Sequence, residues 1–144
     1  MERILPGQDA DGFIRLKLGD ANLYNPAYGG EVEVHRDGLS KPYLHGWTDF
    51  RSRIEWLIKV DSPGNFHVFL ELATDKPSGF SFTANEERQS FKVVPTGGAQ
   101  IFQEQFLGTI QLSQPESSVT IEPIEALWSP ISIRSVTLKP VAPK

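Results

Sequence analysis

Apolar and polar residues alternate with a period of two along much of the chain. The clearest run spans 54–60, where Ile54, Trp56, Ile58 and Val60 share one face. The other face holds Glu55, Leu57 and Lys59. After a Pro63-Gly64 turn the same alternation continues through 66–72. These two runs predict half-buried strands that pair antiparallel through a short loop at the centre of the core, with Trp56 buried.

Other segments of the chain repeat this alternation of apolar and polar residues, with few interruptions. It predicts further strands at 13–18, 31–35, 79–83, 90–94, 102–112, 118–122 and 131–138. The polar residues 85–88 separate two of these strands as the turn of a hairpin does. A change of phase near Arg134-Ser135 predicts a β-bulge. No apolar period of 3.6 persists over three turns, so we expect at most one short helix.

Turn dipeptides such as Asp11-Gly12, Asp37-Gly38, Ser78-Gly79 and Gly97-Gly98 separate the predicted strands. We therefore predict an all-β fold, a two-sheet antiparallel β-sandwich that forms a single domain over 1–144. The composition, 39% hydrophobic and 22% charged, is that of an ordinary globular domain. A chain of 144 residues buries enough surface to fold without disulfides, so the absence of cysteine is no obstacle.

Charge and hydropathy argue against two classes of partner. The formal net charge is −4 and no cluster of Lys and Arg is present, so neither nucleic acid nor an anionic membrane is an expected partner. No run of 18 apolar residues occurs, and the first residues lack the order of a signal peptide. An exported protein would need a signal further upstream.

From about residue 43 onward, several short motifs follow one another in a familiar order. They are Gly46-Trp47-Thr48-Asp49, the Trp-bearing strand 54–60, the Pro-Gly turn and strand of 62–68, Pro95-Thr96-Gly97-Gly98, the Leu-Gly-Thr segment of 106–110 and the last strand 133–140. This order resembles the C-terminal β-sandwich domain of α-L-fucosidases and, more loosely, the jelly-roll carbohydrate-binding modules of glycoside hydrolases.

The resemblance implies a galactose-binding-like jelly roll that serves as an accessory module of a larger polypeptide. Its implied partners are a glycan or oligosaccharide and a catalytic domain in the same polypeptide, and its implied location is secreted or periplasmic. Ala99 stands where the sugar-binding relatives place an aromatic residue, so one platform of their aromatic sandwich is absent.

Sugar recognition needs flat apolar rings for the C–H face of a pyranose and polar groups for its hydroxyls. Trp47 lies outside any alternating run, next to Asp49 and just after Tyr43 and His45. These four residues are candidate ligand-binding residues, with Trp47 as the stacking platform. The alternative is that Trp47 caps one end of the core.

Trp128 is the fifth candidate ligand-binding residue, because it precedes the last strand where relatives carry ligand-contacting loop residues. An equally weighted alternative makes it a hydrophobic plug beneath the 123–130 loop.

Catalytic and metal-binding patterns are missing from the sequence. His35, His45 and His67 lack metal-ligand spacing, and no Gly-x-Ser-x-Gly motif or phosphate-binding glycine loop occurs. Glu31 and Glu33 share a strand face, which we interpret as solvated. We therefore expect no catalytic residue, metal or cofactor.

Three hypotheses about function remain. The first is a non-catalytic carbohydrate-binding accessory module, the second a purely structural sandwich that packs against a catalytic domain, and the third, with the least support, a free-standing hydrolase.

Overall fold

The computed structural model describes residues 12–16, 18, 21–24, 33–35, 43–45, 47 and 51–141, and only the backbone of 33–35, 45, 99 and 100. Its strands are β1 (Ile14–Leu16), β2 (Asn22–Tyr24), β3 (Glu33–His35), β4 (Tyr43–His45), β5 (Arg53–Lys59), β6 (Gly64–Thr74), β7 (Ser78–Ala84), β8 (Glu87–Val93), β9 (Gly98–Leu112), β10 (Glu116–Pro123) and β11 (Ser132–Pro140). These described residues contain no α-helix, and so none long and apolar enough to cross a membrane.

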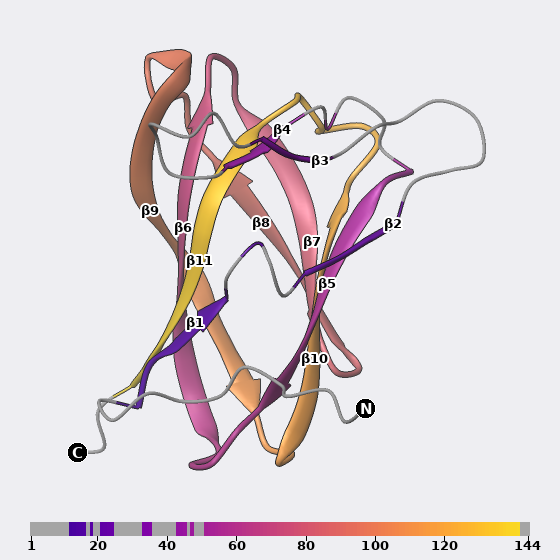
Figure 1. Cartoon of the computed structure of the whole chain (residues 1–144), viewed down its shortest axis with the longest axis vertical. Coiled ribbons are helices and arrows are strands. Elements are labelled where there is room, and N and C mark those ends of the chain that lie inside the picture. Colours follow the sequence, from indigo (N-terminus) through magenta and orange to yellow (C-terminus); the bar gives the residue numbers. More distant parts are fainter. Residues whose placement is uncertain are drawn as a thin grey trace.

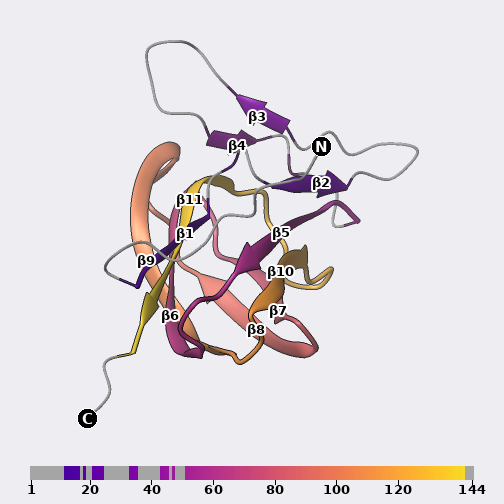
Figure 2. The same ribbon diagram turned by 60° about the horizontal axis from the view of Figure 1, so that its bottom comes forward.

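The strands form two antiparallel sheets that pack face to face (Figures 1 and 2). The first sheet has the order β3-β4-β11-β6-β9, and β1 pairs with β11 on the edge that β4 also uses. The second sheet has the order β2-β5-β10-β7-β8. The predicted two-sheet antiparallel sandwich is confirmed.

The predicted antiparallel pairing of the strands at 54–60 and 66–72 is wrong. β5 pairs with β2 and β10 in the second sheet, whereas β6 pairs with β11 and β9 in the first. The loop between them crosses from one sheet to the other, a step of only about 10 Å. Ile58 of β5 and Val68 of β6 are both fully buried, so the two strands turn their apolar faces toward a common core instead of sharing a ladder.

Other local predictions are confirmed. β7 and β8 form a hairpin whose turn contains Asn85 at φ 56°, a left-handed conformation that asparagine tolerates. The register between β11 and β6 shifts between Ile133 and Ser135, where a bulge was expected. Two short strands, β2 and β4, were not predicted because three residues carry too little alternation.

Alternate residues of the strands form one hydrophobic core between the sheets. Its largest fully buried side chains include Trp47, Trp56, Phe66, Phe80 and Phe82. The burial predicted for Trp56 is confirmed, at 0% exposure. Because inward positions fill the core, the outward positions of each sheet lie on the surface.

Two glutamine side chains close the edge at which β8 of the second sheet meets β9 of the first. The Gln105 amide accepts a hydrogen bond from Val94 N at 3.1 Å and donates one to Val94 O at 2.9 Å. Gln89 Nε2 donates to Thr109 O at 3.0 Å. These side chains supply the bonds that a neighbouring backbone would supply, so the sheets are linked along this edge.

Candidate functional site

The expectation that Trp47 offers an exposed platform is wrong. Its side chain is 1% exposed, and Nε1 donates to Ser52 O at 3.1 Å. Its ring packs on Trp128 with the ring centroids 4.8 Å apart. A fully buried indole has no face left for a sugar, so Trp47 acts as the core cap that was the alternative.

Trp128 is half-buried and completes the same plug. Its Nε1 donates to Trp47 O at 3.1 Å, and the 123–130 loop is held by the Ser78 hydroxyl, which donates to Ser129 O at 2.7 Å. This arrangement agrees with the interpretation of Trp128 as a hydrophobic plug beneath the 123–130 loop. A role of Trp128 in ligand binding stays a prediction.

Of the candidates Tyr43, His45 and Asp49, the structure describes the side chain of Tyr43 only. Tyr43 lies on β4, on the outward side, because the adjacent Leu44 is fully buried and pairs with buried Ile133. His45 ends the same strand, but its side chain lies outside the described residues, as does all of Asp49. Of the predicted cluster, the structure thus places Tyr43 on an outer surface.

That surface is the outer face of the first sheet, and it carries a group of aromatic rings. Phe69 points outward from β6 between buried Val68 and Leu70. It pairs across the sheet with Phe106 of β9, which is 56% exposed. Sequence analysis missed both residues, although an aromatic residue at an outward position of a clear alternating run is a usable signal.

The lower cluster comprises Phe13, His67, Phe69, Phe106 and Lys139. The ring centroids of Phe69 and Phe106 lie 5.4 Å apart, and His67 meets Phe106 edge-on at 5.3 Å. Lys139 Nζ lies 4.2 Å from the Phe69 centroid and 5.7 Å from that of Phe13. Flat rings and hydrogen-bonding groups therefore stand side by side on an open surface.

The upper cluster comprises Tyr43, Phe102 and Arg134. On β6 one residue separates Leu72 from Thr74, whereas on the paired β9 four residues, 99–102, lie between the corresponding positions. In this longer segment of β9, the Phe102 ring contacts the Tyr43 ring, with the ring centroids 5.5 Å apart. The two contacting strands, β4 and β9, are not neighbours in the sheet.

Arg134 is the main polar group of the upper cluster. Its guanidinium carbon lies 3.9 Å from the Phe102 ring centroid, so the two planes are in contact. Its Nε is buried and has no hydrogen-bond partner among the residues that the structure describes. An unmet buried donor costs about 1–3 kcal/mol, and such donors are rare in folded proteins.

The outer face also carries a few charged and hydroxyl groups that can orient a ligand. Lys139 Nζ approaches Glu104 Oε1 at 3.9 Å, and the Ser135 hydroxyl donates to Glu71 Oε1 at 3.2 Å. His67 Nδ1 lies 3.0 Å from the Thr109 hydroxyl. In the described part of the chain no group of three or more His, Cys, Asp or Glu residues could hold a metal ion.

Comparison with solved structures shows the fold. The chain is similar to a native family 35 carbohydrate-binding module from Clostridium thermocellum, with 19% identity, a TM-score of 0.71, and coverage of 90% of this chain and 98% of that one. It is also similar to the C-terminal family 6 module of a laminarinase from Zobellia galactanivorans, with 14% identity, a TM-score of 0.66, and coverage of 88% and 98%.

A third similar structure is a β-(1,4)-mannanase of Podospora anserina that contains a family 35 module, with 20% identity and a TM-score of 0.69. The match covers 93% of this chain and 29% of the mannanase. No protein-family model and no curated protein sequence matches the chain. The chain therefore has the jelly-roll β-sandwich fold that these modules have.

Proposed function

We propose that this chain is a non-catalytic carbohydrate-binding accessory module of a glycoside hydrolase, and that its glycan lies on the outer face of the first sheet. The observation that carries the proposal is the open array of outward aromatic rings on this face, with Phe106 the most exposed of them. Aromatic rings stack on the apolar faces of sugars, and adjacent polar groups bind their hydroxyls.

Both clusters belong to this binding face. The lower cluster supplies the stacking surface of Phe106 and Phe69. The upper cluster supplies Tyr43, one of the residues predicted from the sequence, and the guanidinium group of Arg134. Arg134 and Lys139 are five positions apart on β11, about 17 Å at the rise of a strand, so an extended oligosaccharide suits the face better than a single sugar.

The kind of polypeptide around the module is part of the proposal. The similar structures include two isolated modules and a mannanase in which the match covers a minor part of the chain. We propose that residues 1–144 form one sandwich domain within a larger enzyme, as the likeness to the α-L-fucosidase C-terminal domain implies. His45, Asp49 and Trp128 stay predicted ligand-binding residues.

A glycan array followed by isothermal titration calorimetry tests the proposal. Phe106→Ala should weaken binding of the best glycan at least tenfold, because truncating a central aromatic contact typically costs 2 kcal/mol or more. Tyr24→Ala is the matched control. Tyr24 is a 40% exposed aromatic residue on the second sheet, and Arg53 lies over its ring.

Unchanged affinity in Phe106→Ala, or a loss in Tyr24→Ala instead, would show that the binding face is assigned wrongly. If the wild-type chain binds no glycan of a broad panel, the binding role itself fails. The purely structural alternative then predicts that the same aromatic face packs against a catalytic domain, which hydrogen exchange of the full enzyme would detect.

A further inference from the structure

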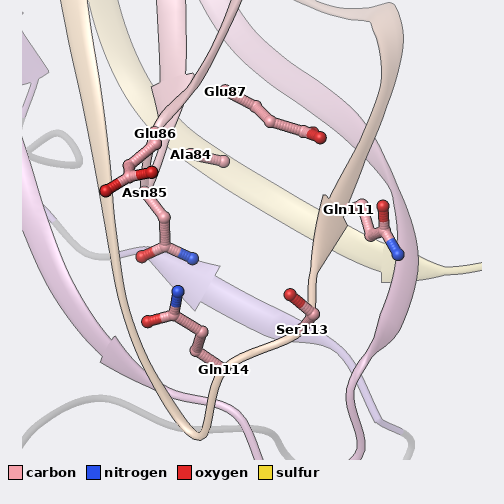
Figure 3. Close-up of a pocket in the computed structure, with 7 residues that line it drawn as sticks. All are labelled: Ala84, Asn85, Glu86, Glu87, Gln111, Ser113 and Gln114. Carbon is pink, nitrogen blue, oxygen red and sulfur yellow. The ribbon is translucent and has the colours of Figure 1, made fainter.

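A second surface feature lies where two turns meet at one end of the sandwich (Figure 1). The turn of the β7–β8 hairpin, the end of β9 and the connection from β9 to β10 line an open pocket of about 170 Å³. Its lining is polar apart from Ala84. Figure 3 shows the amides of Asn85 and Gln114 pointing toward each other on one side, with Glu87 and Gln111 on the other.

Hydrogen bonds around Asn85 fix one wall of this pocket. Asn85 N donates to Ser118 O at 2.8 Å, and Ser118 N donates to Asn85 Oδ1 at 3.0 Å. Asn85 Nδ2 donates to Ser117 Oγ at 3.1 Å, and that hydroxyl donates to Gln114 O at 3.0 Å. The two turns are thus tied together, so a ligand would enter a largely preformed site and less ordering would oppose binding.

The remaining polar groups of the pocket are free to meet a ligand. The side chains of Glu87, Gln111, Ser113 and Gln114 form no hydrogen bond or ion pair within the described part of the chain. Amide and hydroxyl groups each offer both a donor and an acceptor, and a carboxylate offers acceptors. Vicinal hydroxyl groups of a ligand need this mixture, because each hydroxyl donates one hydrogen bond and accepts others.

The charge of the lining residues and the volume of the pocket restrict the class of ligand that the pocket can bind. Glu86 and Glu87 line the pocket together with no Lys, Arg or His, so an anion is repelled. A volume of 170 Å³ lies below the roughly 300–1,000 Å³ of pockets for drug-sized ligands. An apolar ligand would leave the amides unpaired, which is unfavourable. We infer that the pocket is a second binding site, for a neutral polyhydroxylated ligand of the size of one sugar residue.

Such a ligand has two sources, a free monosaccharide or the end residue of a glycan chain. Titration of the ¹⁵N-labelled chain, followed by two-dimensional NMR, tests both with methyl glycosides in one arm and neutral oligosaccharides in the other. The expected result is a saturable shift of the side-chain NH₂ signals of Asn85, Gln111 and Gln114. Saturation by methyl glycosides assigns the free sugar, and saturation by oligosaccharides alone assigns the chain end.

Variants separate this pocket from the aromatic face. Gln111→Ala and Gln114→Ala should each weaken the pocket titration about two- to tenfold, the effect of one hydrogen bond. Gln103→Ala, another exposed glutamine of β9, is the matched control and should leave it unchanged. Phe106→Ala should also leave it unchanged, so failure of the proposed function and failure of this site are distinguishable.

Two results would overturn the inference. One is the absence of any saturable shift at the pocket in both arms. The other is a shift that persists at full strength in the Gln111→Ala and Gln114→Ala double variant.

Discussion

Replacement of Trp47 by alanine distinguishes a core cap from a binding platform. The substitution removes a 1% exposed indole from the core, which typically costs about 3–5 kcal/mol. It also removes the hydrogen bond that Trp47 Nε1 donates to the carbonyl of Ser52, a residue that is itself 1% exposed. Removing one partner of a buried hydrogen bond costs about 1–3 kcal/mol more, so we expect a total loss of about 4–8 kcal/mol.

That loss approaches the whole stability of many domains, about 5–15 kcal/mol, so a gentler variant is needed. Trp47→Phe keeps a ring against Trp128 but loses the bond to Ser52, and it should cost about 1–3 kcal/mol. At about 2–4 °C for each kcal/mol, its melting temperature should fall by about 2–12 °C. Any glycan affinity of the folded Trp47→Phe protein should stay near the wild-type value.

Urea titration followed by tryptophan fluorescence, with thermal melts alongside, measures these effects. Tyr24→Ala serves as the control because Tyr24 is 40% exposed and its truncation should change stability little. A Trp47→Ala protein that melts within about 2 °C of the wild type and binds no glycan would refute the burial of Trp47 and restore it as a platform.

Three further substitutions test the packing. Trp56→Ala should lower the free energy of unfolding by about 3–5 kcal/mol in urea titrations, since Trp56 is fully buried. Gly108→Ala should lower it by about 1–3 kcal/mol, because the new Cβ would lie 2.8 Å from Phe91 Cε1. Gln105→Ala should cost about 1–2 kcal/mol and speed hydrogen exchange at the Val94 amide, which loses its acceptor. An unchanged exchange rate there would contradict the edge closure.

The positions of most strands could be predicted from sequence, but their partners could not. A period of two shows which residues face the core, and β5 and β6 both display it. It carries no information on whether two successive strands share a ladder or face each other across the core. The Pro63-Gly64 turn suits a hairpin, yet here the short connection crosses between the sheets.

The site residues were harder to predict because long-range contacts determine them. Trp47 has polar neighbours in sequence, and its burial depends on Trp128, 81 positions later. Phe69 could be found as an aromatic residue at a polar position of a regular run. The outward direction of Phe106 is hidden, since the register with β6 shifts at Leu107 and changes which residues of β9 face out.

Lys139 on the outer face of the first sheet partly covers an exposed ring, and this cover is compatible with the proposed glycan binding. An uncovered aromatic patch favours nonspecific association. In the free protein, Lys139 lies over Phe69 and covers part of this patch. An exposed cation–π contact contributes only about 0.5–1 kcal/mol, less than the 2 kcal/mol or more of a central aromatic contact with a partner. A sugar can therefore displace Lys139 from Phe69 at little cost. Phe106 is 56% exposed and has no cation over its ring in the described part of the chain, so on the proposed binding face it would be the first ring to contact a sugar.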